Sequence, residues 1–335
     1  MKYVNILNTD VEVSNLCLGT AKFGTIIDEK TSFELLDSFV ELGGNFIDTA
    51  NCYSNWFPGE ESASEKTIGK WIAKNGREKI IVSTKGGYPD LHNKKISRLS
   101  INDIEMDIYN SLNNLRTTYI DIYWLHRDNI NYPVSYFIDL LNDFKKRGII
   151  RYFACSNWTC DRIIEAQIYA KKNNVDGFIA NQMLWNIGKI NQSVLNDDQL
   201  VLMDKTMFSY HENSNFTAIP YSSQANGFFS GTYNYLLNNN FCNANKNYEK
   251  IYYGSTAYEL YYNHYNIEQL RKVRILSEML EITQTQVILL YLMYNKFLTI
   301  PIIGCRNIEQ LRESCNTSNL SNNTRYAQVI RDFMN

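Results

Sequence analysis

The sequence lacks a long apolar run, an excess of charge and a leader-like N-terminus. No stretch of the 335 residues approaches the ~20 consecutive apolar residues that span a bilayer, and residues 1–5 do not form the apolar core of a signal peptide. The formal net charge of −2 gives no reason to expect nucleic acid or an anionic membrane as a partner. We therefore expect a soluble, cytoplasmic protein.

The cysteines are too scattered in sequence to indicate disulfide bonds or a metal site. The seven of them are an odd number spread from position 17 to position 315, so they make neither a disulfide framework nor a closely spaced ligand cluster. Reduced thiols fit this pattern best, and we expect no metal site. No Gly-x-Gly-x-x-Gly motif follows a predicted strand, which removes the main signature of a Rossmann fold.

Short apolar strands alternate with helical patterns along most of the chain. The predicted strands end near residues 20, 48, 85, 126, 156, 182, 220 and 303, and helix-like periodicity separates most of them. Such alternation predicts a parallel sheet with right-handed crossovers, and eight units close it into an α/β fold, the (β/α)8 TIM barrel. Residues 3–7 and 11–13 alternate around Asn8-Thr9-Asp10, which predicts an N-terminal β-hairpin closing the bottom of the barrel.

Length alone would allow two domains, but a barrel of this size is commonly one. No low-complexity linker or composition break interrupts the chain, so we expect a single domain over residues 1–335. Segment 222–266 is rich in Tyr and Asn and has little apolar period. We expect it to form a long loop, with room for a short helix, over the carboxyl-terminal mouth of the barrel, the alternative being a surface insertion without a role.

Four polar side chains follow predicted strands in a way that can bring them together. Asp48, Lys85 and His126 end three strands, and Tyr53 lies in the loop after Asp48. In a barrel of this kind the active site lies at the carboxyl ends of the strands. A tyrosine is a poor proton donor at neutral pH unless nearby cations and hydrogen bonds adjust it, so the lysine and histidine matter. Each of these residues, taken alone, is explained by an ordinary structural role, such as capping a loop or facing solvent. Together they predict a catalytic site.

With these motifs the sequence resembles the aldo-keto reductases, NAD(P)H-dependent carbonyl reductases built on a TIM barrel. The matching segments, in the family's order between about residues 15 and 314, are Asp-Thr-Ala-Asn-Cys-Tyr at 48–53, Ser-Thr-Lys at 83–85, Leu-His at 125–126 and Ile-Ile-Gly-Cys-Arg at 302–306. The resemblance implies that Tyr53 is the general acid and that Lys85, paired with Asp48, makes its phenol more acidic. It implies that His126 orients the substrate carbonyl and can share in the proton relay.

The resemblance also implies an NADP(H) site, with NAD(H) the less favoured cofactor. Ser156, Asn157 and Gln182 match the clamp on the nicotinamide carboxamide, and Tyr221 matches the aromatic ring that stacks on the nicotinamide. The positions matching the rest of the cofactor site are Thr20, Ala21, Ser222, Ser223, Gln224, Ala225 and Asn226 for the pyrophosphate, Gly304, Cys305 and Arg306 for a phosphate, and Gln310, Glu313 and Ser314 for the adenosine. Backbone amides at a helix start favour an anion, and Arg306 adds charge.

The chain departs from the family's pattern at two places. Tyr-Ser-Ser-Gln at residues 221–224 replaces the usual Tyr-Ser-Pro-Leu, so the pyrophosphate loop loses the rigidity of proline. Glu313 and Ser314 stand where the family usually has Glu-Asn, which weakens the expected hydrogen bonds to adenine. Neither change touches the residues expected to transfer the proton.

The expected substrate is a small-molecule aldehyde or ketone, including one derived from a sugar. Trp56 and Trp158 lie in loops just past strand ends and are expected to wall the substrate site. Two alternatives share the same cofactor: a redox-neutral sugar epimerase using bound NADP(H), and a binding protein that senses the cofactor. A nucleophilic role for Cys52 is a further local possibility, although no histidine is adjacent in sequence.

Overall fold

The barrel is closed by eight parallel strands, as expected. In this computed structural model, residues 1–57, 59–91, 93–195, 197–238 and 256–334 are described. The strands are β3 (Cys17–Gly19), β4 (Phe46–Asp48), β5 (Ile81–Gly86), β6 (Ile120–Leu125), β7 (Ile150–Ser156), β8 (Ala180–Gln182), β9 (Thr217–Ala218) and β10 (Ile302–Ile303). From β3 to β9, each strand pairs in parallel with the next. β10 also pairs with β3, and hydrogen bonds between Ala218 and residues 298 and 300 close the ring. The prediction of a (β/α)8 fold is confirmed.

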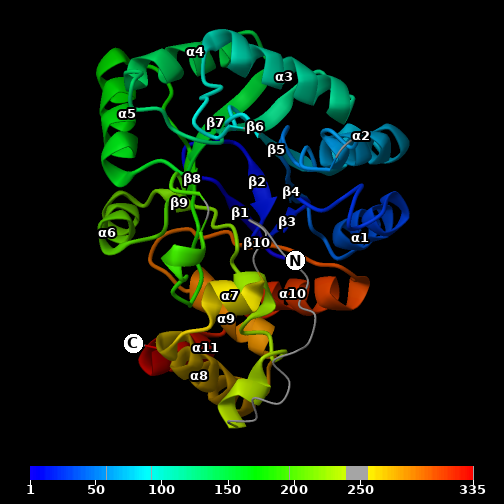
Figure 1. Cartoon of the computed structure of the whole chain (residues 1–335), viewed down its shortest axis with the longest axis vertical. Helices are drawn as coiled ribbons and strands as arrows, with labels where there is room; N and C mark the ends of the chain where they lie inside the picture. Colours follow the sequence, from blue (N-terminus) through cyan, green and yellow to red (C-terminus); the bar gives the residue numbers. More distant parts are fainter. Residues whose placement is uncertain (58, 92, 196, 239–255, 335) are drawn as a thin grey trace.

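Helices surround the strands (Figure 1). The outer ring is α1 (Glu29–Glu41), α2 (Ala63–Asn75), α3 (Ile101–Leu115), α4 (Val134–Lys146), α5 (Cys160–Asn173), α6 (Lys205–Ser214), α9 (Gln284–Met293) and α10 (Ile308–Leu320). Polar residues start several of them: Asp28 caps α1, and Ser100 and Thr283 form capping boxes at α3 and α9. In the described part of the chain, no helix combines the length and apolar character needed to cross a membrane.

The predicted hairpin closes the lower end of the barrel. β1 (Tyr3–Asn5) and β2 (Glu12–Ser14) pair antiparallel, with Val4 opposite Val13. Val13, Ile6 and Val11 are buried and join the apolar cluster inside the barrel. Because this end is filled by apolar side chains, the open end lies at the carboxyl termini of the strands.

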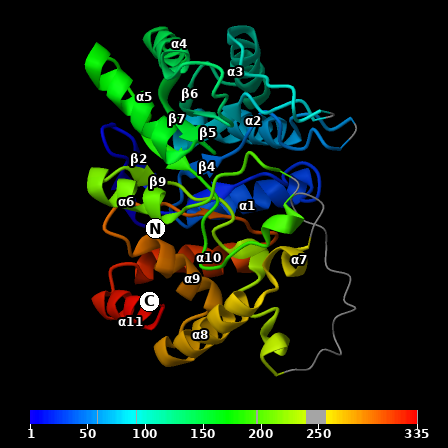
Figure 2. The same ribbon diagram turned by 60° about the vertical axis from the view of Figure 1, so that its left-hand side comes forward.

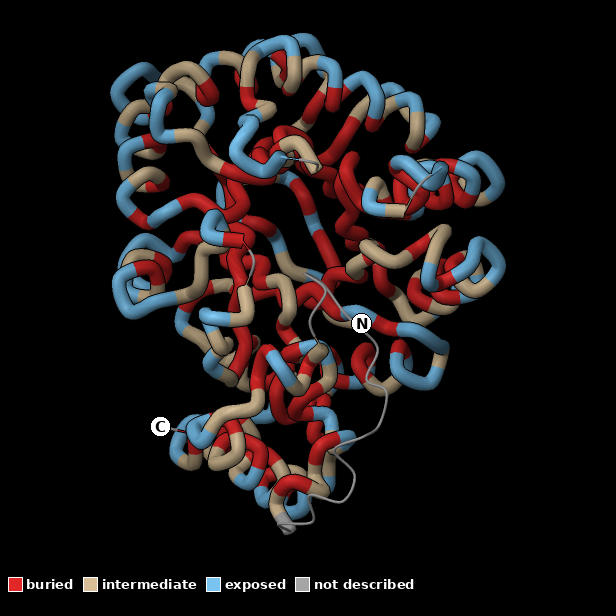
Figure 3. Tube along the Cα trace, viewed as in Figure 1, coloured by how far each residue is buried: buried red, intermediate tan, exposed pale blue. Residues whose placement is uncertain are grey.

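Strand side chains divide between two layers of core, since successive residues point to opposite faces. Along β6, Ile122 and Trp124 belong to the cluster inside the barrel, while Tyr123 and Leu125 pack outward against α3, α4 and α5. Figure 3 shows the same division across the molecule, with buried residues on the strands and inner helix faces and exposed residues around the rim. The strands are therefore held from both sides, and this fixes where their ends point.

Part of segment 222–266 is more ordered than expected. Two short 3-10 helices, Ala225–Gly227 and Asn234–Asn238, precede α7 (Ala257–Tyr261), and α8 (His264–Leu280) begins inside the predicted loop; residues 239–255 lie outside the described part. Phe228, Phe229 and Tyr233 are buried against α8. α8 packs beside α9 and α11 (Thr324–Met334) (Figure 2). The described portion therefore forms part of the core and is more than a surface insertion.

Candidate active site

A cavity of about 600 Å³ opens at the carboxyl ends of the barrel strands. Asp48, Tyr53, His126 and Gln182 line one end of it, and residues of the loop after β10 and of α10 line the other. These side chains lie up to 266 residues apart in the sequence, from Asp48 to Ser314. They meet because the carboxyl ends of parallel strands lie on one face of the barrel. The cavity is large enough for an elongated small molecule.

Asp48 and the Tyr53 phenol lie at the floor of this cavity, with Lys85 directly behind them. The Nζ atom of Lys85 donates to Asp48 Oδ2 at 2.5 Å, to the Thr49 carbonyl at 2.6 Å and to the Tyr53 hydroxyl at 3.1 Å. The side chains of Lys85 and Asp48 are only 1% and 3% exposed, so water screens their attraction little. A cation fixed beside a phenol stabilises the phenolate, which suits the phenol to give up a proton.

The other oxygen of Asp48 is also held. Oδ1 accepts a hydrogen bond from Ser83 Oγ at 2.7 Å and another from Gln182 Nε2 at 3.1 Å. With every part of the carboxylate bonded, the ammonium of Lys85 has a fixed position. Lys85 itself lies behind Tyr53 and is not among the residues that line the cavity.

His126 faces Tyr53 across the cavity with ring centroids 6.1 Å apart. Burial, together with the charges of Arg127 and Lys85, lowers the pKa of His126 well below its ordinary value, so the ring is neutral at physiological pH. Its Nδ1 lies 3.7 Å from Cys52 Sγ, a histidine contact that the sequence did not reveal. Burial raises the pKa of the Cys52 thiol to about 12, which disfavours a thiolate nucleophile there.

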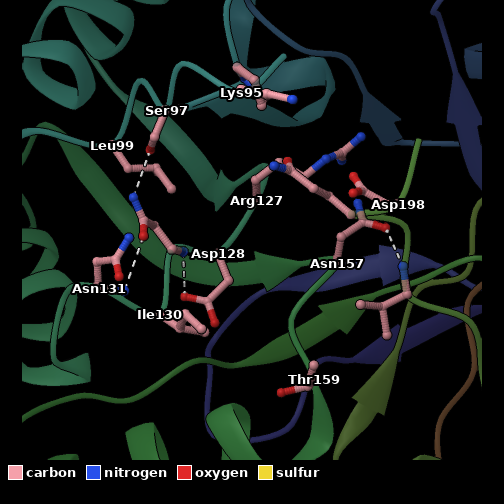
Figure 4. A pocket seen from close by; sticks show the side chains of 15 residues that line it. Lys95, Ser97, Leu99, Arg127, Asp128, Ile130, Asn131, Asn157, Thr159 and Asp198 are labelled. Atoms are coloured by element: carbon pink, nitrogen blue, oxygen red, sulfur yellow. Dashed lines mark hydrogen bonds between the residues drawn. The ribbon is translucent and has the colours of Figure 1, made fainter. Parts of the chain in front are cut away.

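Amide and hydroxyl groups converge next to this set. Asn157 has the left-handed φ of 58°, and its Oδ1 accepts from the Tyr221 hydroxyl at 2.8 Å. The same oxygen accepts from the backbone N–H of Val201 at 3.2 Å, a bond drawn as a dashed line at Asn157 in Figure 4. Its Nδ2 donates to Ser156 Oγ at 3.0 Å. Together with Gln182, these groups offer both donors and acceptors, as recognition of a carboxamide requires.

At the far end of the cavity, the two departures from the family's pattern meet. Gln224 Nε2 donates to Ser314 Oγ at 3.1 Å, and Gln224 Oε1 accepts from the Gly304 backbone at 3.0 Å. Ser223 Oγ donates to the Ile302 carbonyl at 2.5 Å and holds the loop against β10. A side-chain carbon added at Gly304 would meet no atom within 4 Å, so the backbone there is open to a ligand.

Most residues predicted for cofactor binding lie in one continuous lining. They are Thr20, Ala21, Ser156, Asn157, Gln182, Tyr221, Ser222, Ser223, Gln224, Asn226, Gly304, Cys305, Arg306, Gln310, Glu313 and Ser314. Ala225 is the exception, because it does not line this cavity. It is fully buried among apolar residues near α8, since the chain turns there through left-handed conformations at residues 222, 225 and 226.

The two tryptophans predicted to wall the substrate site lie in different surroundings. Trp56 is 43% exposed and meets the Tyr53 ring edge-on, with centroids 6.4 Å apart. Trp158 is fully buried, packs against Phe137 and Phe178, and donates from Nε1 to the Arg127 carbonyl at 3.1 Å. The prediction for Trp158 is therefore wrong, because the residue after a strand end turned back into the core.

Sequence reasoning missed Arg127, which lines the same cavity. Its guanidinium is 3% exposed, donates to Asp197 Oδ2 at 2.9 Å and lies 4.9 Å from the centre of the Tyr88 ring. Arg127 and Asn157 also line a second cavity of about 390 Å³ (Figure 4). The position of Arg127 directly after His126 was a usable signal, but Asp197 is 70 residues away and gave none.

These residues fit a nicotinamide dinucleotide. At one end of the cavity, beside the Tyr53 phenol, lie groups that can hydrogen-bond a carboxamide. At the other end lie the open backbone of Gly304 and the side chain of Arg306, just before α10. A helix start of this kind suits a phosphate, because its backbone amides and dipole favour an anion. The fit is to an extended ligand with an amide at one end and negative charge at the other.

Known proteins share both the sequence pattern and the fold. The model of the Aldo/keto reductase family matches residues 15–329. The uncharacterized oxidoreductase YrpG of Bacillus subtilis (strain 168) is 27% identical over 99% of this chain and 96% of its own length. An aryl-alcohol dehydrogenase, GME11368 of Pestalotiopsis microspora, is 33% identical over 51% of this chain and 46% of its own. A norsolorinic acid reductase of Aspergillus flavus is 32% identical over 55% and 50%.

A solved structure gives the same answer for the fold. The thermostable aldo-keto reductase Tm1743, in complex with the inhibitor epalrestat, superposes with a TM-score of 0.71 at 19% identity, covering 99% of this chain and 100% of its own. The match of the family's model to nearly the whole sequence is the stronger finding. The chain therefore belongs to the aldo/keto reductase family, oxidoreductases that use nicotinamide cofactors.

Proposed function

We propose that the chain is an NADP(H)-dependent reductase that converts an aldehyde or ketone, including a sugar-derived one, to an alcohol within a single domain. One observation carries the proposal: the Tyr53 hydroxyl lies 3.1 Å from Lys85 Nζ, which is itself 2.5 Å from Asp48, at the floor of the main cavity. Reduction of a carbonyl places charge on its oxygen, and a phenol beside a fixed ammonium can neutralise that charge with a proton.

In this proposal each residue has a separate task. Tyr53 gives its proton to the carbonyl oxygen, and Lys85 stabilises the phenolate left behind. Asp48 and the Thr49 carbonyl hold the ammonium, as their distances of 2.5 and 2.6 Å allow. Because the Cys52 thiol keeps its proton, it can donate to His126 Nδ1, which leaves an Nε2–H on the neutral ring to donate to the substrate oxygen.

In this proposal the residues at the cofactor end of the cavity bind the dinucleotide and orient its nicotinamide. Ser156, Asn157 and Gln182 would hold the carboxamide, with Tyr221 against the nicotinamide ring, and a bound nicotinamide supplies the hydride. Gly304 and the other residues around the start of α10 would hold the phosphate end. We propose NADP(H) over NAD(H) because Arg306 adds an exposed positive charge at that end.

The remaining assignments follow from the same cavity. Trp56, which meets the Tyr53 ring edge-on, is proposed as part of the substrate wall. The scattered cysteines support a cytoplasmic location.

The test is Tyr53→Phe, with Tyr88→Phe as its control. Tyr88 lines the same cavity, but burial raises its pKa to about 12, so it is a poor proton donor. We expect Tyr53→Phe to lower kcat for aldehyde reduction by roughly 10²–10⁴-fold, the usual contribution of a general acid, with NADPH binding retained. Tyr88→Phe should keep most activity.

Two results would reject the reductase assignment. A Tyr53→Phe variant with the wild-type rate would remove Tyr53 from the mechanism. Tight NADPH binding without net oxidation, across a panel of aldehydes and keto-sugars, would favour a redox-neutral epimerase or a cofactor sensor. Fluorescence quenching measures binding, and absorbance at the NADPH band measures oxidation.

A further inference from the structure

Glu65 lies behind the Tyr53–Lys85 pair, outside the lining of the main cavity. It is in the first turn of α2 and is fully buried, and burial raises its pKa. Its carboxylate accepts from Thr84 Oγ1 at 2.6 Å, from Asn114 Nδ2 at 3.0 Å and from Asn51 Nδ2 at 3.3 Å, and Ser111 on α3 also hydrogen-bonds to it. These donors are neutral, so hydrogen bonds offset the cost of burying the acid.

Two of these donors, Thr84 and Asn51, adjoin the residues that handle the proton. Thr84 precedes Lys85 on β5, and because side chains alternate along a strand, Thr84 faces α2 while Lys85 faces the barrel interior. Asn51 is two residues before Tyr53, and its backbone N–H donates to the Lys85 carbonyl at 2.9 Å. Glu65 therefore ties the loop that carries Tyr53 to the strand that carries Lys85.

We infer that Glu65 is a positioning residue, which sets the separation of the Tyr53 hydroxyl and the Lys85 ammonium by holding Asn51 and Thr84 from behind the sheet. The inference rests on the proposed function, in which that pair supplies the proton. Tyr53 is on a loop, and these side-chain ties add to the backbone bond from Asn51 that holds the loop in register with β5. A displacement of 1 Å in a reacting geometry can cost about 10²-fold in rate.

Asn114 provides a control within the same hydrogen-bond cluster. It donates to the same carboxylate at 3.0 Å, but it belongs to α3, and no residue of α3 is among those found to line the main cavity. Its removal weakens the hold on Glu65 without releasing Tyr53 or Lys85. If Glu65 has only a structural role, Asn51→Ala and Asn114→Ala should have similar effects on kcat. If Glu65 positions the pair, Asn51→Ala should lower kcat and Asn114→Ala should not.

The experiment compares Asn51→Ala, Thr84→Val and Asn114→Ala in the full chain. For each variant, thermal unfolding, the NADPH dissociation constant, and kcat and KM for one aldehyde are measured. We expect kcat to fall at least about 10-fold for Asn51→Ala and Thr84→Val, with KM and NADPH binding within about 2-fold of wild type. The alkaline limb of their kcat–pH profiles should also move, since the phenol has shifted relative to Lys85.

For Asn114→Ala we expect wild-type kcat and an unmoved pH profile, with a loss of thermal stability comparable to that of Asn51→Ala. A second pair tests the acid itself. Glu65→Gln keeps an oxygen for Asn51 and places an amide that can donate to the Thr84 hydroxyl, so kcat should stay within about 3-fold. Glu65→Met has similar length but no polar atom, so its kcat should fall at least about 10-fold.

The inference is overturned if the three single variants lower kcat equally, or if kcat follows thermal stability alone. It is also overturned if Glu65→Met keeps the wild-type kcat. If Asn51→Ala does not fold, Thr84→Val, which keeps the side-chain shape, decides the question. A failure of the proposed function would look different, because wild-type protein would then oxidise no NADPH, or Tyr53→Phe would be as active as wild type.

Discussion

The charges of Asp48 and Lys85 should depend strongly on each other for the stability of the fold, so removal of either one should be costly. Asp48→Asn tests this. The pair is 2.5 Å long and both side chains are at most 3% exposed. Asp48→Asn keeps the shape and the oxygen that accepts from Ser83 and Gln182, but it removes the charge that balances Lys85. An uncompensated buried charge is among the more costly changes that a single substitution makes.

The expected cost follows from what Lys85 would retain. Breaking a buried pair by removing one partner costs about 3–5 kcal/mol of the free energy of unfolding. The ammonium would still donate to the Thr49 carbonyl and the Tyr53 hydroxyl, at 2.6 and 3.1 Å, so we expect the lower end, about 3 kcal/mol. Lys85→Met should cost a similar amount, about 3 kcal/mol, because Asp48 keeps two neutral donors.

Urea unfolding followed by tryptophan fluorescence measures these losses. The double variant Asp48→Asn/Lys85→Met removes both charges, so its loss should be close to that of one single variant, about 3 kcal/mol rather than about 6. A matched control is Glu29→Gln, which breaks a pair with Lys70 of the same 2.5 Å length whose side chains are about half exposed. That control should cost under about 1 kcal/mol. Additive losses in the double variant, or equal losses at the two pairs, would refute the reasoning.

Two further predictions concern the cofactor end and the pH dependence of stability. Arg306→Ala should weaken NADPH binding about 10-fold and leave NADH binding unchanged. The control is Arg312→Ala, which changes an exposed arginine on α10, the helix that follows Arg306, outside the cavity lining, and should affect neither nucleotide. Quenching titrations measure both affinities, and an equal loss for the two nucleotides would contradict a phosphate role. Burial lowers the pKa of His211 to about 4, so between pH 6.5 and 4 the unfolded chain binds a proton that the folded chain does not. The stability that neutral His211 contributes is complete above pH 6.5 and is lost on acidification. In urea unfolding, wild type should lose about 3 kcal/mol more of its free energy of unfolding than His211→Gln between pH 7 and 4. Parallel pH curves for the two proteins would show that His211 does not titrate in this way.

Much of the fold was predictable because its signals are local. Short apolar runs end at glycines or polar residues, and helical patterns follow most of them, so strand order and the barrel class could be inferred from neighbouring residues. The hairpin was predicted from an Asn-Thr-Asp turn between two short runs, and the structure pairs Val4 with Val13 across it. Boundaries were less certain: α8 starts at His264, inside the segment 222–266 that was expected to form a long loop.

The gathering of site residues was also predictable, for a topological reason. Once Asp48, Lys85 and His126 are placed at the carboxyl ends of parallel strands, closure of the barrel brings them to one face whatever the helices contain. The structure has Lys85 within hydrogen-bond distance of both Asp48 and Tyr53. Their catalytic roles stay predictions until the variants are measured.

Sequence reasoning was least informative where a side chain could point in more than one direction. Trp158 follows a strand end, as a substrate-contacting residue would, but its ring fills a gap between Phe137 and Phe178. Ala225 follows the seventh barrel strand, yet a left-handed turn directs it into the core near α8. Local sequence does not specify which of two available spaces a side chain fills, because that depends on the packing of distant segments.

The sequence by itself determined the strand ends, the barrel class and the set of residue types at the mouth, since each depends on periodicity within a few neighbouring residues. Only the tertiary structure decided the pairings across long separations: Gln224 with Ser314, Arg127 with Asp197, and Glu65 with Asn51 and Thr84. The physical reason is that a hydrogen bond requires placement within a few tenths of an ångström. That placement is set by how helices and strands pack on one another, and periodicity carries no information about it.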